Sequence, residues 1–230
     1  MRIIKGLGKI GLWGIIKTLW FNFRFIPFKE AIFLPVLLSS KVEVQNMRRG
    51  RIVLDGLGGG KFGILRIGLQ DREYCYNKPS MLNILGILVL NGSGIHSFSP
   101  GTILYVGPEA TLEIGEGFTA SHDLKIYCRH KITIGKDNMW SYYNVVMDND
   151  GHYIYDREGN QINQNREVAF GNHVWMGCRC LVLKGSRIAD GVVIASGTTV
   201  RKELKKTNSI YGNNSAEPLK ENIIWDRKLV

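Results

Sequence analysis

The sequence predicts an all-β domain in which short strands stack into one coil, preceded by a helical arm. Two observations support this prediction. From residue 170 a large apolar residue returns every six residues, at Phe170, Met176, Val182, Ile188, Ile194 and Val200. Four residues after each of the first five stands a small or β-branched residue, at Val174, Cys180, Ser186, Val192 and Thr198. Neither a helix nor a simple alternating strand produces a period of six.

Strand geometry explains the period. Side chains two residues apart in a strand share one face, so the small residue and the next large apolar residue point the same way. Each six residues then form one short strand and one corner, and each coil buries its inward face only with its neighbours. Glycines at the second place (Gly171, Gly177) and at the fourth (Gly185, Gly191, Gly197) are expected at corners, where the backbone conformation is unusual.

The same period runs through earlier segments with small insertions. Further starts of six stand at Val106, Ile114, Ala120, Ile126, Ile134 and Trp140, and "RIVLDG" and "ILRIGL" are weaker early copies. We therefore expect a helical arm over residues 1–45, a coiled domain over 46–205 and a tail over 206–230.

The arm is both basic and apolar. Pro27 is expected to end the helix. The apolar residues before it recur at helical spacing: Ile4, Leu7, Leu12, Ile15, Ile16, Leu19 and Phe23. Lysines at 5, 9 and 17 interrupt the segment too often for a membrane span, and no cleavage site of a signal peptide follows. Two interpretations stay open. The helix packs on the body or on a sister subunit, or it lies on a membrane surface with Trp13, Trp20 and Phe21 at headgroup level.

Composition excludes little. The net charge of +10 suits nucleic acid, an anionic membrane, an acidic polysaccharide or a phosphate-bearing cofactor. The chain has no zinc-finger spacing and no aromatic motif of an RNA-recognition sheet, which argues against a reader of nucleic acid. Cys178 and Cys180 form a C-x-C pair without a second pair at ligand spacing, so we expect no metal site and reduced thiols in a cytosolic setting.

The regular period fails after Val146. The next starts would be His152, Glu158 and Gln164, none of which can fill an apolar core, so a loop over residues 147–168 is predicted. Loops of this length in a compact domain are usually functional, although a solvated excursion is the alternative. Asp148, Asp150 and His152 would share one side of an extended segment. An acid beside an imidazole can fix its tautomer and stabilise the imidazolium.

The segments "DGH" and "FGNHVWMGCRCLVLKGSRIADGVVIASGTTVRK" make the chain resemble the hexapeptide-repeat acyltransferases, most closely the O-acetyltransferases of capsule and lipopolysaccharide. The resemblance implies a left-handed parallel β-helix, a homotrimer, acetyl-CoA as donor and active sites between subunits. It also implies that His152 is a general base, which takes a proton from a sugar hydroxyl that attacks the thioester directly. Asp150 is then the expected orienter of the imidazole, and Asp148 is a weaker candidate.

A donor site follows from the same resemblance. Trp175 would line the groove for the pantetheine or acyl end, unless it packs at the trimer contact instead. Ser196 and Gly197 match a turn whose backbone pairs with the pantetheine amides. The nucleotide phosphates would contact a basic cluster of Arg201, Lys202 and Lys205. The alternative is that these charged residues are only solvent-exposed and bind no ligand. Asn214 stands where relatives often carry a proline, which puts a contact of that ring with adenine in doubt.

On the acceptor side we expect Tyr142, Tyr143 and Asn144. The other histidines, at 96, 122, 130 and 173, are expected to be structural or surface residues. The leading hypothesis is an acetyl-CoA-dependent O-acetyltransferase for a sugar hydroxyl of a surface polysaccharide or its lipid-linked precursor. We expect it to be cytoplasmic, in peripheral contact with the inner membrane face. Alternatives are a small acceptor (a free sugar, serine or a drug) or a non-catalytic trimeric binding module.

Overall fold

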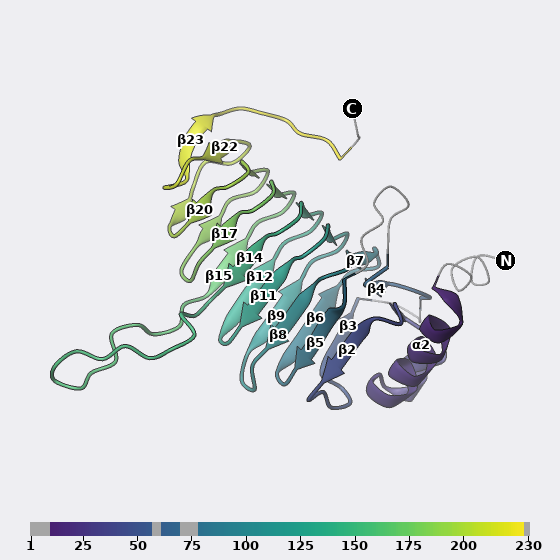
Figure 1. The fold of residues 1–230 in the computed structure, drawn as a ribbon. Coiled ribbons are helices and arrows are strands. Elements are labelled where there is room, and N and C mark those ends of the chain that lie inside the picture. Colours follow the sequence, from purple (N-terminus) through teal and green to yellow (C-terminus); the bar gives the residue numbers. More distant parts are fainter. Residues whose placement is uncertain (1–9, 57–60, 70–77, 228–230) are drawn as a thin grey trace.

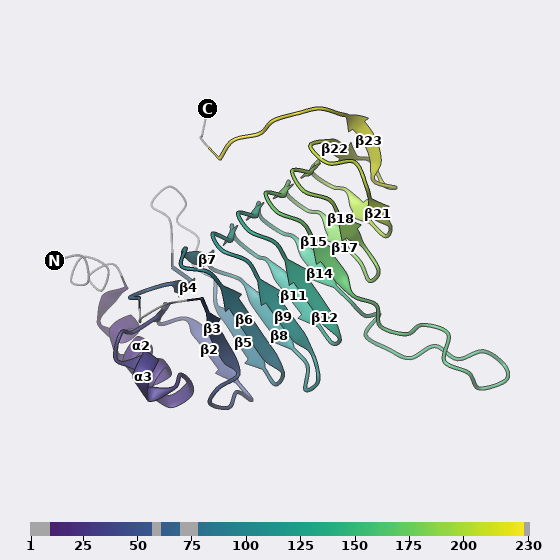
Figure 2. The same cartoon turned by 180° about the vertical axis from the view of Figure 1, so that it is seen from behind.

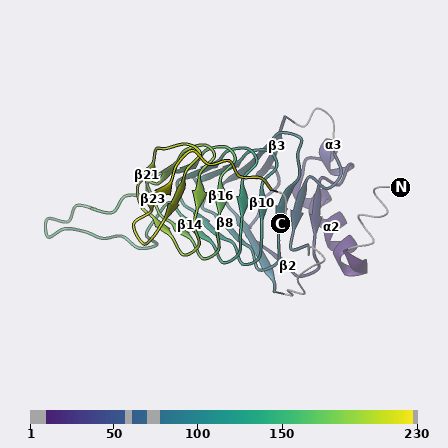
Figure 3. The same cartoon turned by 90° about the horizontal axis from the view of Figure 1, so that it is seen from above.

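Three sheets of parallel strands form the sides of a long prism (Figures 1 and 3). The computed structural model describes residues 10–56, 61–69 and 78–227. Successive strands belong to sheets 1, 2 and 3 in turn, so each coil adds one strand to every sheet, and each strand pairs with the strand three places later. We call the turn between sheets 1 and 2 the first corner, that between sheets 2 and 3 the second, and that between sheets 3 and 1 the third.

Sheet 1 contains β1 (Val36–Leu38), β4 (Leu65–Ile67), β7 (His96–Phe98), β10 (Thr119–Ala120), β13 (Met139–Trp140), β16 (Trp175–Met176), β19 (Val193–Ile194), β22 (Ile210–Gly212) and the antiparallel β23 (Glu217–Lys220). Sheet 2 contains β2 (Val42–Gln45), β5 (Ser80–Ile84), β8 (Ile103–Val106), β11 (Lys125–Cys128), β14 (Val145–Met147), β17 (Leu181–Val182) and β20 (Thr199–Val200). Sheet 3 contains β3 (Ile52–Asp55), β6 (Ile87–Asn91), β9 (Thr111–Ile114), β12 (Lys131–Ile134), β15 (Val168–Phe170), β18 (Arg187–Ile188) and β21 (Glu203–Leu204).

The predicted inward positions are confirmed. All the large and small residues that define the six-residue period from residue 170 to 200 are buried. The two polar ones close their own corners: the hydroxyl of Ser186 donates to the carbonyl of Leu183 at 2.6 Å, and that of Thr198 to the carbonyl of Ala195 at 2.6 Å. A buried hydroxyl that makes such a bond avoids the cost of lost hydration, so these two residues fit an otherwise apolar core.

Aromatic rings stack along the core of the middle coils. Ring centroids lie 5.1 Å apart between Phe98 and Phe118, 4.9 Å between Phe118 and Trp140, and 4.6 Å between Trp140 and Phe170. Pairs at these separations contribute beyond their buried area. The column therefore ties the coils before the long loop to the first coil after it.

The corner glycines serve two different purposes. Gly185, Gly191 and Gly197 have positive φ angles of 80°, 70° and 76°. Residues other than glycine rarely adopt such angles, so these glycines have the unusual backbone conformation that was predicted. Gly171 and Gly177 are needed for another reason: a Cβ atom there would lie 2.8 and 2.7 Å from a backbone nitrogen of the next coil. Close stacking of coils, rather than backbone conformation, requires glycine at the second place.

Both ends of the coil reach further than expected. Helix α2 (Gly11–Phe25) ends just before Pro27, as predicted, and the short α3 (Phe28–Ala31) follows. The first strand then begins at Val36 instead of after residue 46, and sheet 1 continues past residue 205 to Gly212. Neither segment shows the six-residue period, because helix α2 and strand β23 cover these ends in place of another coil. Ile4, Leu7, Lys5, Lys9 and Cys75 lie outside the described residues.

Helix α2 covers the open edge of sheet 1 (Figure 2). Its buried Asn22 accepts from the amide of Val36 at 3.1 Å and donates to the carbonyl of Val36 at 2.7 Å. Buried Thr18 accepts from the amide of Leu38 at 3.0 Å. Two side chains thus replace the missing neighbour strand of β1. Within the described part of the chain, no helix combines the length and apolarity that crossing a bilayer requires.

A buried histidine predicts how stability depends on pH. His96 is fully buried, and among the described residues neither ring nitrogen has a partner at good hydrogen-bond geometry. Burial lowers its pKa to about 4 from an ordinary 6.5, with the Asn91 backbone and the Glu116 charge opposing. Because the unfolded chain takes up the proton first, the free energy of unfolding should fall as pH decreases from about 6.5 to about 4, by roughly 3 kcal/mol.

Thermal unfolding of the His96→Leu variant between pH 4 and pH 7 checks this expectation. The variant should lose most of the acid dependence, whereas His130→Leu, at an exposed imidazole, should retain it. An acid profile of His96→Leu identical to that of the wild type would contradict the assignment.

Candidate active site

The long loop leaves the coil after Met147, at the position in the sequence where it was predicted, and this position is the second corner. Strand β14 ends at Met147 and β15 begins at Val168, and the chain between them projects far from the prism (Figures 1 and 3). The two arms of the loop run antiparallel, with a bridge between Tyr155 and Gln161. At the base the amide of Arg166 donates to the carbonyl of Asp148 at 3.0 Å, so the coil resumes in register.

Asp148 belongs to the coil and not to the loop surface. It is fully buried, and its carboxylate accepts from the backbone amides of Arg129 at 2.8 Å and His130 at 2.7 Å. The neighbouring Asn149 side chain donates to it at 2.9 Å. The expectation that Asp148, Asp150 and His152 share one side is therefore wrong. The strand ends at Met147, and Asp148 turns inward to satisfy the second corner of the preceding coil.

Asp150 and His152 lie on the base of the projecting loop, but their side chains do not meet. The Asp150 carboxylate accepts from the Lys184 ammonium and, at 3.1 Å, from the Asn163 amide. Asn163 also donates to the carbonyl of His152 at 2.7 Å and accepts from the amide of Ile154 at 2.7 Å. The His152 imidazole is exposed and makes no hydrogen bond to any described residue. Asp150 thus contacts the main chain of His152 through Asn163.

Two cationic side chains, Lys184 and Arg166, lie near the Asp150 carboxylate at the second corner. The hydrogen bond from Lys184 is the main reason that the pKa of Asp150 lies below its usual range; the Asn163 amide and the charge of Arg166 act in the same direction. Neither Asn163 nor Lys184 was expected from the sequence. Lys184 occupies an ordinary corner position, and Asn163 lies in the polar run "NQINQN" that reads as solvated surface.

The residues expected to bind the pantetheine arm lie at the first corner and on its adjoining strand. Trp175 on β16 points outward with 38% of its surface exposed. Strand β16 pairs with β19, whose chain continues to the exposed Ser196 and Gly197. Both turn residues contact Cys178: the Ser196 hydroxyl accepts from its amide at 3.2 Å, and the Gly197 amide donates to its carbonyl at 2.8 Å. A Cβ atom on Gly197 would meet nothing within 4 Å, so the space beside this turn is open.

The expected acceptor residues divide between surface and core. Tyr142 and Tyr143 are exposed at the first corner, with ring centroids 5.6 Å apart. Asn144 is fully buried: it donates to the Ser141 carbonyl at 2.9 Å and accepts from the Cys180 amide at 2.8 Å. Because these bonds close the first corner, Asn144 is a structural residue and cannot contact an acceptor without breaking them.

The expected phosphate-binding residues lie at the C-terminal end of the coil, next to β20 and β21, and are exposed. Lys202 forms an ion pair with Glu217 at 2.9 Å, and Lys205 lies 3.6 Å from Glu203. Arg201 has no ion pair with any described carboxylate. Arg201 and Lys202 follow sheet 2 and so continue the second corner, whereas Lys205 begins the third.

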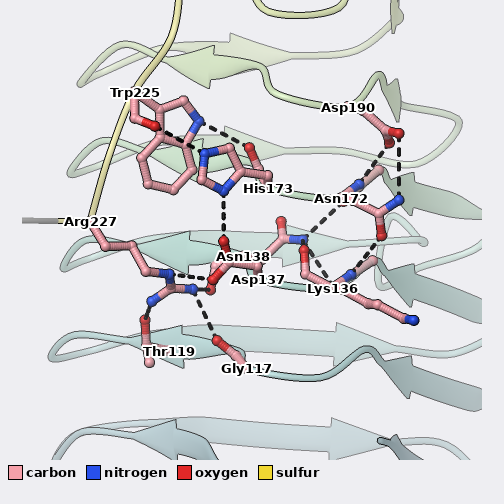
Figure 4. Close-up of polar contacts among 12 residues, drawn as sticks. Gly117, Thr119, Lys136, Asp137, Asn138, Asn172, His173, Asp190, Trp225 and Arg227 are labelled. Atoms are coloured by element: carbon pink, nitrogen blue, oxygen red, sulfur yellow. Dashed lines mark hydrogen bonds and ion pairs between the residues drawn. The ribbon is translucent and has the colours of Figure 1, made fainter. Parts of the chain in front are cut away.

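The tail runs back along the third corner (Figure 4). The Trp225 ring stacks on His173 with centroids 3.8 Å apart, and its indole N–H donates to the His173 carbonyl at 3.0 Å. The His173 ring also contacts the Asp137 carboxylate at 2.7 Å. This confirms the expectation of a structural role for His173. The Trp225 ring in turn lies 5.9 Å from that of Trp175, next to the expected donor site.

Arg227 fixes the end of the described tail to earlier coils (Figure 4). Its guanidinium pairs with Asp137 and donates to the Thr119 hydroxyl at 2.8 Å and to the Gly117 carbonyl at 2.9 Å. The sequence carried no local signal for these contacts, because the partners lie about a hundred residues earlier in the chain.

The candidate residues thus form two groups at opposite edges of sheet 2. Trp175, Ser196, Gly197 and the tyrosine pair lie at or beside the first corner. The loop with His152 lies at the second corner, as do Arg201 and Lys202, and Lys205 begins the third. A single chain therefore does not bring His152 to Trp175 or to the turn at Ser196 and Gly197.

Substitution of the two aspartates should separate structure from chemistry. Asp148→Ala leaves two buried amides without an acceptor and should lower the free energy of unfolding by about 3 kcal/mol. Asp150→Ala removes a partly exposed ion pair and should change stability by less than about 1 kcal/mol. Chemical denaturation of both variants provides the comparison, and equal losses would contradict the buried role of Asp148.

No family model matches the chain. It is 35% identical over 131 residues to the polysialic acid O-acetyltransferase of Neisseria meningitidis, which covers 56% of this chain and 61% of that protein. The match thus spans less than two thirds of that relative. Over 138 residues the chain is 30% identical to a Saccharomyces cerevisiae protein provisionally described as an acetyltransferase, covering 60% of this chain and 68% of that one.

A solved structure supports the same fold. The N-acyltransferase from Bacillus cereus, in complex with dTDP and 3-hydroxybutyryl-CoA, matches with a TM-score of 0.51 and 16% identity over 93% of this chain and 90% of that chain. The six-residue period, the three parallel sheets and these relatives agree. The chain belongs to the hexapeptide-repeat acyltransferases, whose coil is a left-handed parallel β-helix.

Proposed function

We propose that the protein is an acetyl-CoA-dependent O-acetyltransferase that modifies a sugar hydroxyl of a surface polysaccharide or its lipid-linked precursor. One observation carries the proposal. The long loop between β14 and β15 presents the exposed imidazole of His152. Hydrogen bonds hold the main chain of the loop in place where it leaves the coil. The similarity to an O-acetyltransferase of a polysaccharide supports the reaction and the class of acceptor.

His152 acts as the general base. Its ring has no partner among the described residues, so a nitrogen is free to receive a proton. As the sugar hydroxyl attacks the thioester carbonyl, its proton passes to the imidazole. The carbon–sulfur bond then breaks, the acetyl group stays on the sugar oxygen, and the imidazolium returns the proton to the departing thiolate. General-base catalysis of this kind contributes about 10²–10⁴-fold.

Asp150 is a positioning residue. Its carboxylate accepts a hydrogen bond from Asn163, and Asn163 bonds to the main chain of His152 and of Ile154. Lys184 fixes the carboxylate from the neighbouring coil. Asp150 therefore positions the main chain of the loop next to the coil and does not bond to the imidazole N–H. This role differs from the direct Asp150–His152 pair expected from the sequence.

The first corner binds the donor. The exposed Trp175 and the open turn at Ser196 and Gly197 leave room for the pantetheine arm along the outer side of β16 and β19. Polar backbone groups of the turn suit its amides, and an indole face suits its apolar segments. Arg201 and Lys202 at the second corner and Lys205 at the third supply positive charge for the nucleotide phosphates, although ion pairs with Glu217 and Glu203 neutralise the two lysines.

The active site requires more than one copy of the chain. The expected pantetheine site (Trp175, Ser196 and Gly197) and His152 lie at opposite edges of sheet 2, so the loop of one copy must reach the first corner of another. A homotrimer satisfies this for every copy, because a closed ring of heterologous contacts gives each chain one neighbour of each kind. Trp175 then either lines the groove or packs at the contact, and the exposed Tyr142 and Tyr143 face the acceptor.

Replacement of His152 tests the chemistry. His152→Ala should lower the rate of acetyl transfer from acetyl-CoA by about 10²-fold or more. His130→Ala, an exposed histidine at the same corner of the preceding coil, is the matched control and should leave the rate unchanged. Steady-state release of the CoA thiol, with polysaccharide and with free sugars as acceptors, measures both. Undiminished turnover by His152→Ala in a folded protein would contradict the proposal, and a preference for free sugars would favour the small-acceptor alternative.

Mixing two inactive variants tests the shared site. His152→Ala and Trp175→Ala chains, each expected to have low activity alone, should regain about a quarter of the wild-type rate when equal amounts co-assemble at random. One contact in four then has both residues intact. Mixing the two purified assemblies without dissociation is the control. A mixed assembly as inactive as its parents would place base and donor site on one chain.

A further inference from the structure

Helix α2 is apolar on two opposite faces. One face contributes to the core through buried Phe21 and Phe25 and covers β1 through Thr18 and Asn22. The other face is exposed and carries a continuous stripe at spacings of three and four residues: Leu12, Trp13, Ile16, Leu19, Trp20 and Phe23. Beyond the helix, Phe28 lies next to Phe23, with ring centroids 6.2 Å apart, and Ile32 and Phe33 are also exposed. We call this set of nine residues the cap patch.

Within the described residues, only Trp20, against Phe25 at 5.3 Å, and Phe23, near Phe28 at 6.2 Å, make ring contacts, so the fold gives little reason for the rest of the cap patch. All hydrogen bonds from helix α2 to β1 come from its buried face, so polar residues on the outer face would cap the coil equally well. Trp13, with 73% of its surface exposed, contributes little to the stability of a single chain. Soluble proteins rarely expose contiguous apolar surface of this extent unless it binds something.

The surroundings of the cap patch are cationic. Residues 10–51 contain seven basic residues and two acidic ones: Lys17, Arg24, Lys29, Lys41, Arg48, Arg49 and Arg51 against Glu30 and Glu43. Arg24, Lys29, Arg48 and Arg49 are exposed. Lys17 instead turns back to the carbonyls of Ser40 and Val42, both at 2.7 Å, and so leaves the outer face of the helix apolar.

We infer that the cap patch lies on a lipid bilayer that contains anionic headgroups. Helices that bind membrane surfaces bury aliphatic side chains at the acyl boundary, place tryptophans at headgroup depth and set cations against lipid phosphates. The cap patch has all three features. A second copy of this chain is a poorer occupant, because its own basic rim would face the first, whereas anionic lipid neutralises the rim.

The placement leaves the rest of the molecule free. The cap patch lies at the end of the coil opposite β22 and β23, and the long loop projects sideways between the two ends (Figures 1 and 2). If the proposed trimer forms with its coils side by side, three cap patches face one membrane, and their combined binding is much stronger than that of one.

Vesicle binding tests the inference on the full-length protein. The double variant Trp13→Ser, Trp20→Ser is compared with the wild type by co-sedimentation with phosphatidylcholine vesicles, with and without phosphatidylglycerol. Tyr153→Ser on the loop is the matched control, because Tyr153 is an aromatic residue of the same 73% exposure. We expect wild type and control to bind the anionic vesicles, high salt to weaken binding, and the double variant to bind about tenfold more weakly or worse.

Quenching of tryptophan fluorescence by brominated lipid gives a second measurement: it should be strong in the wild type and largely lost in the double variant. Equal binding of the double variant and the wild type, or no preference of the wild type for anionic vesicles, would overturn the inference. So would a smaller molar mass of the double variant by light scattering, which would make the cap patch a contact between copies. Transfer to a soluble acceptor is measured in parallel, so loss of the proposed activity is distinguishable from loss of membrane binding.

Discussion

The structure depends on one constraint: each coil can bury its inward side chains only against the coils next to it. Every six residues must therefore deliver a large apolar residue and a small one to the same interior, and every corner must let the next coil approach closely. Parallel pairing between strands three places apart follows directly, as do the glycines whose Cβ atoms would collide with the neighbouring backbone. The same constraint permits the long loop. Since β14 pairs with β17 and β15 with β12, residues can be inserted between them without changing any register.

The most regular part of the chain was the most predictable. The inward residues from 170 to 200, the end of the helix before Pro27 and the loop after Met147 all follow from periodicity and from residues that cannot enter a core. The ends were not predictable in the same way. Around Val36 and Tyr211 the coil is covered by a helix and by an antiparallel strand, so the local sequence need not repeat every six residues. A search for the period alone therefore finds fewer coils than the chain contains.

The site shows where reasoning from spacing fails. Asp148 and Asp150 are two residues apart, yet one is buried under the backbone amides of residues 129 and 130 and the other faces Lys184. The alternation of a strand could not foresee this, because the strand stops one residue before Asp148. Asn144 is a similar case: its neighbours Tyr142 and Tyr143 are exposed, while its amide closes a corner. Asn163 and the tail residues Trp225 and Arg227 were missed because their partners are distant in sequence and only the coil brings them together.

A stack of parallel strands has two open edges, and an open edge is a template on which another chain can add. In this protein Thr18 and Asn22 occupy the hydrogen-bonding groups of β1, while β23 runs antiparallel to β22 at the opposite end. Neither edge repeats the parallel pattern of the coils between them. In sheet 1, the addition of a further parallel strand, the characteristic hazard of a repetitive sheet, is thereby hindered at both edges.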